Sequence, residues 1–483
     1  MTHGDDGDEP IEGVGDWPKP GLGALFPFHL VFPKDQSANT LNFTKHSYDA
    51  LANAMHPGLG SARVHDVLAP GMDTPMVGDT SPLTRDAAAP SRLSSHMRVL
   101  NLAPHCTLPP KDGADRRAWH LHESLAPLGV EECFIGRSIV VDGGKEKPLP
   151  GMESSWRNRK SLAALAAFVS GKSYWEFKML TPAFLREVTA HRPEDFHATI
   201  IHFLYSLPLL KQWRGRKIRL LVETHNYDPA IYAGLRDVSR NPLLRYLCDQ
   251  ASRNAITALK ALPRGTTLIH VSEADAAAYR KVRADLRHEV IENGCRVAPR
   301  ASAPDYLTTE KKQLIFVGSL STQMNQDALL NFSRVYWPSL RGVARMRVVG
   351  SNPSSGLATL CIAEGWELCP NVSEAELEGF YTSAHFAVAP FAYGAGSKLK
   401  LMEACGRGVP MLSTQAGVTG MSTIPPCVHV TDEPKEWKRL LQEWTPTAQD
   451  IRGTLDFAEQ ISWPALAARL AKIIADTELV TIP

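Results

Sequence analysis

The residues best suited to chemistry lie in one segment, from Pro390 to Pro410, with the sequence PFAYGAGSKLKLMEACGRGVP. The apolar run that leads into it predicts a buried strand, and Gly394 and Gly396 permit a tight turn of the backbone. Ser397 is of the type that caps a helix, and Gly408 is of the type that follows one. The segment therefore predicts a strand, a glycine turn and a helix, in that order.

Two lysines and a glutamate give this helix a chemical interpretation. Lys398 and Lys400 fall in its first turn, where the free N–H groups and the macrodipole disfavour cations. A bound anion explains them, because backbone N–H groups and two ammonium groups suit a diphosphate, while Glu403 suits ribose hydroxyls. The alternative is that both lysines are solvated and that Glu403 pairs with Lys400.

Two series of alternating strands and helices are expected to position this segment. One runs from about residue 26 to 300 and the other from Gln313, which predicts an α/β protein with two doubly wound, Rossmann-like domains facing a cleft. Ligands of such sheets bind beyond the carboxyl ends of the strands, where Gly318, Gly350 and Gly394 fall. The predicted parts are a disordered tail (1–24), an N-terminal domain (25–300) with a low-complexity loop (about 70–95), a linker (301–312) and a C-terminal domain (313–483).

The composition of the 483 residues excludes several classes of protein. With 44% apolar and 21% charged residues, the chain is typical of globular proteins. Its 52 basic and 51 acidic residues nearly cancel, so we expect no nucleic-acid partner. The eight cysteines form no C-x-x-C pair and no metal-ligand spacing, and the first residues lack the pattern of a signal peptide. We therefore expect a cytoplasmic location.

One segment raises the question of membrane contact. From Arg157 the sequence RNRKSLAALAAFVSGKSYWEFK combines basic residues with aromatic residues and an apolar helical face. Two interpretations remain open, namely a helix on an anionic membrane beside a lipid-linked acceptor, and a buried helix with a basic start. The longest apolar stretch of the chain, Leu162 to Val169, is too short to span a bilayer.

The segment from Pro390 resembles the nucleotide-sugar signature of the family 4, or group 1, retaining glycosyltransferases, which have the GT-B fold. The family shows a proline after a strand, a GAG loop, paired lysines, a Glu-Ala pair and a Gly-x-Pro at this spacing. The matching residues are Pro390, Gly394 to Gly396, Lys398 and Lys400, Glu403 and Ala404, Gly408 and Pro410. The resemblance extends over roughly Leu314 to Leu470, with LIFVGSLSTQMNQDALLNF, MRVVGSNP, NVSEAELEGFYTSAHFAVAP and SWPALAARL. It implies that the last helices cross back to the first domain.

The resemblance is weaker in the first half of the chain. LLVETHNYDPAIY from Leu220, HVSEAD from His270 and IENGCRV from Ile291 follow the family's order, but before residue 215 only HLVFPKDQSANTLN matches, and poorly. Two departures stand out. The loop 36–40 contains no glycine where many relatives have a pair, and Ala395 stands where many members have a glutamate.

The resemblance implies a role for each candidate residue. Lys398 and Lys400 hold the donor diphosphate, Glu403 accepts from the ribose, and His225 lies near the donor sugar. The remaining donor-binding residues are Gly318, Ser319, Gly394, Ala395, Gly396 and Ser397, and Asn39 and Thr40 meet the acceptor. The blander alternatives are a tight turn at Gly318, a structural histidine at 225 and a polar core residue at Glu223; Asn226 and Asp228 share the loop of His225.

The expected function is transfer of a hexose-type sugar from a nucleotide-diphosphate donor to a glycan or lipid-linked acceptor, with retention, in polysaccharide or glycoconjugate biosynthesis. The resemblance implies no metal and no cofactor beyond the donor. Asp6-Gly7-Asp8 matches an Asp-x-Asp metal motif, but it lies in the polar tail without a preceding strand. Two other functions remain open: a sugar-nucleotide 2-epimerase of the same fold, and a non-catalytic nucleotide-sugar-binding protein marked by Ala395.

Overall fold

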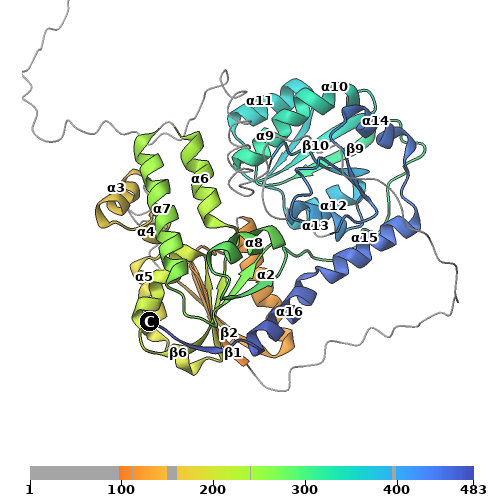
Figure 1. Cartoon of the computed structure of the whole chain (residues 1–483). Coiled ribbons are helices and arrows are strands. Elements are labelled where there is room, and N and C mark those ends of the chain that lie inside the picture. The colour runs from red at the N-terminus through yellow and green to blue at the C-terminus, as the bar shows by residue number, and fades with distance from the viewer. Residues whose placement is uncertain (1–96, 111, 150–159, 240, 394–398, 422) are drawn as a thin grey trace, which may run out of the picture.

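The computed structural model describes residues 97–110, 112–149, 160–239, 241–393, 399–421 and 423–483, which form two α/β domains (Figure 1). The first domain is built on the strands up to residue 290, and the second on the strands from residue 312. The predictions for residues 1–24, for 70–95, for Asn39 and Thr40, and for the segment 394–398 lie outside the described residues.

The N-terminal domain contains a nine-stranded sheet with the order β4-β3-β2-β1-β5-β6-β7-β8, in which β15 also pairs with β6. The strands β2, β1, β5, β6, β7 and β8 are parallel, whereas β3, β4 and β15 are antiparallel to their neighbours. The central strands are buried along almost their whole length, as expected of a parallel sheet covered on both faces. Their bounds are β1 Met97–Ala103, β2 Val130–Gly136, β3 Ile139–Asp142, β4 Lys145–Pro148, β5 Ala198–His202, β6 Lys217–Glu223, β7 Thr267–His270, β8 Arg287–Val290 and β15 Leu479–Thr481.

Helices surround this sheet, and α2 is the one that faces the second domain (Figure 1). α2 begins after Asp112, whose carboxylate accepts a hydrogen bond from the Asp115 N–H, and so satisfies one of the free donors of the first turn. The helices are α2 Gly113–Leu125, η3 Ala126–Leu128, α3 Lys160–Ser170, α4 Tyr174–Met179, α5 Pro182–Ala190, η5 Pro193–Asp195, η6 Leu204–Trp213, α6 Asp228–Val238, α7 Pro242–Lys260 and α8 Glu273–Val282.

The C-terminal domain has a six-stranded parallel sheet with the order β11-β10-β9-β12-β13-β14. Its core includes the fully buried rings of Phe316, Phe332, Phe386 and Trp437. The strands are β9 Lys312–Val317, β10 Ala344–Gly350, β11 Glu367–Pro370, β12 Phe386–Ala389, β13 Met411–Ser413 and β14 Val428–Val430. The helices are α9 Gln323–Asn331, the π-helix η7 Phe332–Tyr336, α10 Trp337–Leu340, α11 Ser355–Glu364, α12 Glu374–Ser383, α13 Leu399–Cys405, α14 Pro434–Glu443 and α15 Ala448–Gln460.

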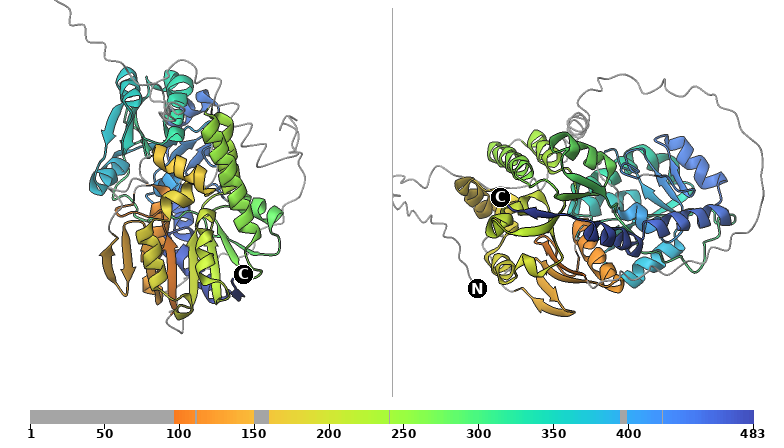
Figure 2. Two further views of the ribbon diagram at one scale, coloured as in Figure 1. Left: turned by 90° about the vertical axis from the view of Figure 1, so that its left-hand side faces the viewer. Right: turned by 60° about the horizontal axis from the view of Figure 1, so that its bottom comes forward.

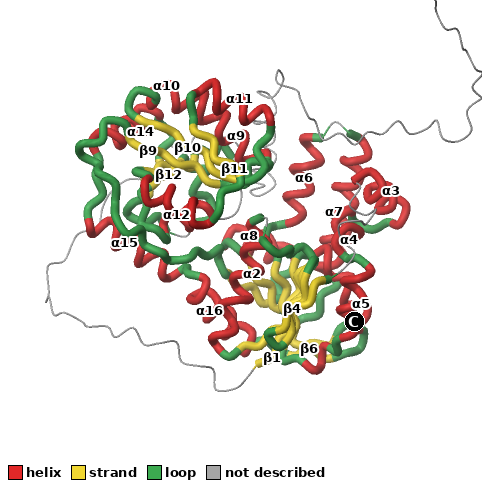
Figure 3. Tube along the Cα trace, turned by 180° about the vertical axis from the view of Figure 1, so that it is seen from behind, coloured by secondary structure: helices red, strands yellow, loops and turns green. Residues whose placement is uncertain are grey.

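The last helix, α16 (Trp463–Ala475), belongs to the N-terminal domain in space although it follows the C-terminal domain in sequence. It packs beside α2, and Leu466, Leu470 and Ile474 share a core with Val99 of β1 and Leu121 of α2 (Figures 2 and 3). β15 then adds to the edge of β6, with Leu479 opposite Arg219. The chain therefore crosses between the domains twice.

The segment proposed for membrane contact forms α3 and α4. In α3 the small residues Ala163, Ala164 and Ala167 are buried, while Leu165, Phe168 and Val169 are 49%, 45% and 77% exposed. The helix thus packs one face and leaves apolar side chains on the other. Among the described residues, no helix combines the length and the apolar character required to cross a membrane.

Candidate active site

Lys400 is held against the loop that follows β9. Its Nζ donates a hydrogen bond to Asn325 Oδ1 at 2.5 Å, and Asn325 Nδ2 donates to the Ser319 carbonyl oxygen at 2.8 Å. The ring centroids of Phe391 and Phe316 lie 4.5 and 5.2 Å from the same Nζ, within the range of cation–π contact. A segment that follows β12 is thereby joined to the turn that follows β9, at the carboxyl edge of the sheet.

Gly318 lies where two side chains leave little room for a Cβ atom. A Cβ atom on Gly318 would lie 2.9 Å from Asn325 Nδ2 and 3.3 Å from Lys400 Nζ. A Cβ on Gly350 would lie only 1.7 Å from the Gly318 carbonyl oxygen, so the turns after β9 and β10 touch through their backbones. A tight turn alone therefore does not account for the glycine at position 318. The absence of a side chain there also leaves room for the Lys400–Asn325 pair.

Glu403, one turn after Lys400, faces the N-terminal domain. Its Oε1 accepts a hydrogen bond from Arg116 Nη1 of α2 at 2.7 Å, and the two side chains are 18% and 46% exposed. A Cβ on Gly113, the first residue of α2, would lie 3.1 Å from Leu399 Cδ1, the first residue of α13. The starts of α2 and α13 therefore meet between the domains. Glu403 contacts Arg116 and Lys400 contacts Asn325, so the alternative pairing of Glu403 with Lys400 is not observed.

Other predicted donor residues are only partly described. Ser319 Oγ lies 3.1 Å from Ser321 Oγ, and Gly408 has the left-handed backbone (φ 63°) expected of a residue just past a helix end. The GAG loop and the residues after it, which are Gly394, Ala395, Gly396, Ser397 and Lys398, lie outside the described residues, as do Asn39 and Thr40. Their roles stay predictions.

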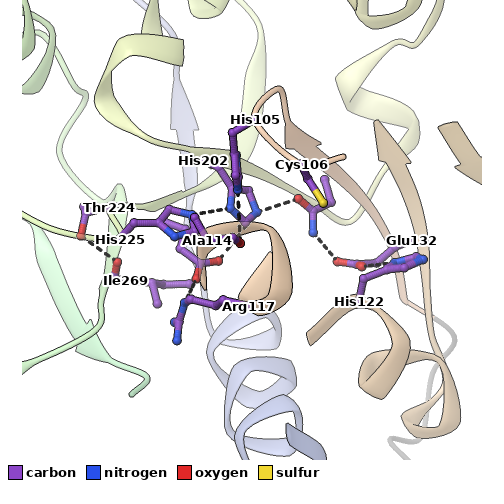
Figure 4. A network of polar contacts seen from close by, with 12 residues as sticks. His105, Cys106, Ala114, Arg117, His122, Glu132, His202, Thr224, His225 and Ile269 are labelled. Atoms are coloured by element: carbon purple, nitrogen blue, oxygen red, sulfur yellow. Dashed lines mark hydrogen bonds and ion pairs between the residues drawn. The ribbon is translucent and has the colours of Figure 1, made fainter. Parts of the chain in front are cut away.

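On the N-terminal side, His225 lies in a cluster of three buried histidines (Figure 4). Its Nε2 is 2.8 Å from His202 Nδ1, and the ring centroids of His105, His202 and His225 are between 5.0 and 5.3 Å apart. The ring of Phe203 stacks on His225 with the centroids 4.1 Å apart. Burial is the main cause that lowers the pKa of all three histidines and favours their neutral form. The predicted place of His225 beside the donor sugar stays a prediction.

Glu223, which could have been an ordinary polar core residue, forms a buried ion pair with Arg117 of α2. The two side chains are 3% and 1% exposed. Burial alone would raise the pKa of Glu223, but the charge and hydrogen bond of Arg117 together with the charge of His202 lower it. Arg117 Nη1 also donates to the Glu292 carbonyl at 2.6 Å, which joins α2 to the segment that leads into the second domain.

Asp228 and Asn226 support the loop after β6 from within the N-terminal domain. Asp228 opens α6 and is buried, and no described residue hydrogen-bonds its Oδ2. Burial raises its pKa to about 8, against the opposing effect of a hydrogen bond from the Leu204 N–H, so the carboxyl group is protonated at neutral pH. The Asn226 carbonyl accepts a hydrogen bond from the Tyr279 hydroxyl at 3.0 Å. Both residues therefore have structural contacts that account for them.

Comparison with known proteins identifies the C-terminal domain. Residues 311–439 match the model of a protein family described as "Glycosyl transferases group 1". This range contains the Lys400–Asn325 pair, Gly318 and Glu403. The C-terminal domain is therefore similar to group 1 glycosyltransferases over this range. No similar protein was found among curated sequences.

Solved structures establish that this chain has the GT-B fold. Trehalose-6-phosphate synthase OtsA is 12% identical with a TM-score of 0.54, over 79% of this chain and 100% of that chain. The catalytic domain of starch synthase IV from Arabidopsis thaliana, bound to ADP and acarbose, is 12% identical with a TM-score of 0.51, over 79% and 99%. Anabaena HepE in complex with UDP is 13% identical with a TM-score of 0.50, over 78% and 100%.

Several residues of this candidate site were not predicted from the sequence. Asn325 belongs to the Asn-x-Asp-Ala-Leu run that carries part of the family resemblance, so a signal for it was present. Arg116, Arg117, His105 and His202 belong to the first half of the chain, where no recognised motif marks them. The structure places His105 two residues beyond β1.

Proposed function

We propose that this glycosyltransferase moves a sugar from a nucleotide-diphosphate donor to a glycan or lipid-linked acceptor, with retention at the anomeric carbon, in polysaccharide or glycoconjugate biosynthesis. The observation that carries the proposal is the assembly of Lys400, Asn325 and Ser319 at the carboxyl ends of β9 and β12. In doubly wound sheets this edge is where ligands bind. The GT-B neighbours support the proposal, since two of them were solved with UDP or with ADP.

The proposed reaction depends on stabilising the departing nucleotide diphosphate. Lys400 supplies positive charge that is already positioned by Asn325 and by two aromatic rings, so little reorganisation is needed as negative charge develops. Lys398, the GAG loop and the backbone of Gly318 and Ser319 are proposed to complete the diphosphate site. We propose that no metal ion is needed to bind the diphosphate, because these cationic and N–H groups compensate its negative charge.

The ribose and the acceptor are proposed to bind on either side of the diphosphate. Glu403 accepts hydrogen bonds from the ribose hydroxyls once its contact with Arg116 opens. The acceptor approaches from the N-terminal domain, where Asn39 and Thr40 are its candidate contacts and His225 is the candidate contact of the donor sugar. Movement of the two domains toward each other would exclude water and bring the acceptor to the sugar.

The experiment that tests this proposal is a thermal-shift panel with UDP, GDP, ADP, dTDP and their sugar conjugates, without added metal. A ligand that binds only the folded state raises the unfolding midpoint. We expect one nucleotide diphosphate and its sugar conjugates to shift the midpoint selectively. With that donor, release of free nucleotide should require an acceptor. A shift without any transfer would favour the non-catalytic binding protein, and turnover of the donor sugar without an acceptor would favour the 2-epimerase.

A further inference from the structure

Three adjacent parallel strands bring three histidine rings to one point of the N-terminal domain. His105 follows β1 by two residues, His202 is the last residue of β5, and His225 follows β6 by two residues. β5 lies between β1 and β6 in the sheet, so their carboxyl ends are neighbours. One ring nitrogen of each histidine lies within 4.8 Å of the others, and all three residues are buried (Figure 4).

Hydrogen bonds fix which nitrogen of two rings carries the proton. His105 Nε2 lies 3.4 Å from the Ala114 carbonyl oxygen, which can only accept, so Nε2 is the donor and Nδ1 holds the lone pair. His202 Nε2 lies 3.0 Å from Asn101 Oδ1, and Asn101 Nδ2 is occupied by Glu132 Oε1 at 3.0 Å. His202 therefore also donates through Nε2 and keeps its lone pair on Nδ1. A neutral imidazole with a lone pair directed inward is the form that binds a metal.

Hydrogen bonding within the cluster leaves one inward nitrogen without a partner. His202 Nδ1 accepts a hydrogen bond from His225 Nε2 at 2.8 Å, and metal binding would displace that proton. His105 Nδ1 is buried and has no hydrogen-bond partner among the described residues, in a side chain that is only 9% exposed. An unpaired buried polar atom is costly, and in a native protein it calls for an explanation. A cation at the centre of the cluster would give all three nitrogens a partner.

The spacing of the rings suits such a cation. With Zn–N bonds of about 2.0–2.1 Å, tetrahedral geometry separates the centroids of two ligand imidazoles by about 5 Å. The three separations are 5.3 Å for His105–His202, 5.0 Å for His105–His225 and 5.1 Å for His202–His225. The near-equality of the three distances is what a common central ion requires.

The surroundings also resemble the support of a metal site. Asn101 and Glu132 continue the chain of hydrogen bonds behind His202, and Glu132 Oε2 contacts His122 Nδ1 at 2.6 Å. Such outer partners fix the tautomer and orientation of a ligating imidazole. The backbone is unusual here too, since Phe203 and His225 have φ angles of 65° and 57°, a region that bulky residues rarely adopt and that clusters at functional sites.

We propose that His105, His202 and His225 bind one divalent transition-metal ion, with Zn²⁺ as the best fit to three imidazoles in tetrahedral geometry. The fourth position is left to water or to a ligand arriving at the carboxyl edge of the sheet. The ion lies in the N-terminal domain, apart from Lys400, and the inference does not depend on the proposed donor site.

The second cluster of possible ligands, Cys133, Asp142 and His191, provides a matched control. Burial raises the pKa of the Cys133 thiol to about 12, so this cluster lacks a ready thiolate, and Asp142 is already paired with Arg98 at 2.8 Å. His191→Gln should therefore leave metal binding unchanged.

The test uses the full chain, produced without a histidine tag, with Zn²⁺ and Co²⁺ as probes. After chelation and dialysis, we expect one equivalent of either ion to bind, with the visible absorption of tetrahedral Co²⁺ and a rise of the unfolding midpoint. His105→Gln should weaken binding by more than about 100-fold, and Asn101→Ala by about 10–100-fold as an outer partner. The midpoint of chelated His105→Gln should match that of the chelated parent chain, which shows that the variant folds.

Three outcomes would overturn the inference. The first is that the parent chain binds neither Zn²⁺ nor Co²⁺ stoichiometrically. The second is a His105→Gln variant that retains the metal-induced midpoint shift. The third is an equal loss of binding in His191→Gln, which would place the ion at the other cluster.

Discussion

Arg116 Nη1 of α2 lies 2.7 Å from Glu403 Oε1 of α13, so one hydrogen-bonded ion pair joins the two domains at the edge of the proposed donor site. The glutamate is the same residue that the family resemblance assigns to the ribose. If Glu403 has that role, Arg116 occupies one of the two carboxylate oxygens that the ribose needs, and we expect the pair to part when the donor binds.

Glu403→Ala is expected to abolish transfer while the protein stays folded. The side chain is 18% exposed and its removal leaves Arg116 free to reach solvent, so the cost in stability is small. The measurement is the rate of nucleotide release in the presence of acceptor, with the unfolding midpoint as the control for folding. Normal activity in this variant would contradict the ribose assignment.

Arg116→Ala should tighten nucleotide binding modestly, because it removes the competitor for Glu403. A pair this exposed is worth at most about 1 kcal/mol, so the gain should not exceed about fivefold in Kd. Titration calorimetry with the nucleotide diphosphate found in the thermal-shift panel measures it. If the variant instead binds the nucleotide tenfold or more weakly, Arg116 contacts the nucleotide itself.

Replacing both lysines of the signature, Lys398→Ala with Lys400→Ala, should weaken the binding of a nucleoside diphosphate far more than that of the nucleoside. The loss is expected to fall on the phosphates because ammonium groups act there as point charges. Lys438→Ala, an exposed lysine of α14, is the matched control and should change neither affinity. Equal weakening for diphosphate and nucleoside would mean that this segment does not hold phosphate.

Glu223→Gln should destabilise the N-terminal domain strongly, since it leaves the Arg117 guanidinium buried without a counter-charge. Breaking one partner of a buried pair costs about 3–5 kcal/mol, which lowers the unfolding midpoint by at least about 6 °C in a domain of this size. The control is Glu436→Gln, which breaks an exposed pair with Arg439 and should cost no more than about 1 kcal/mol. Similar midpoints for the two variants would show that the buried pair contributes little.

Asp228→Asn should change how stability depends on pH. The pKa of Asp228 is raised to about 8, so between about pH 4 and pH 8 the folded chain keeps a proton that the unfolded chain releases. The contribution of this carboxyl group to the stability of the parent chain is therefore fully present at the acid end of this window, and it is lost as the pH rises toward 8. The midpoint of the variant relative to the parent should increase from pH 5 to pH 8 and then level off.

The exposed substitution Asp456→Asn is the control for that experiment, and its midpoint difference should stay flat over the same range. A flat difference for Asp228→Asn as well would mean that this carboxyl group is not held protonated by the fold.

Local sequence patterns predicted the alternating strands and helices of the C-terminal domain, because the relevant signals lie within a few residues of one another. The series expected from Gln313 is observed, and β12 ends just before the segment from Pro390. By contrast, β5 is difficult to predict, because it is entirely buried and only five residues long, and periodicity does not distinguish so short an apolar run from part of a buried helix.

The contacts between domains could not be predicted in the same way. Arg116 and Glu403 are 287 positions apart, and Arg117 meets Glu223 across 106 positions. Likewise the three histidines become neighbours only because β5 is inserted between β1 and β6 in the sheet. A pattern within one segment contains no information on such pairing, which depends on the order of strands in the completed sheet.

The crossing of α16 back to the N-terminal domain affects how the protein is made. Leu466, Leu470 and Ile474 complete a core with Val99 and Leu121, and β15 pairs with the beginning of β6. These residues leave the ribosome after the entire C-terminal domain. During synthesis the N-terminal domain must therefore wait with one apolar face uncovered until the residues that follow the C-terminal domain have been made.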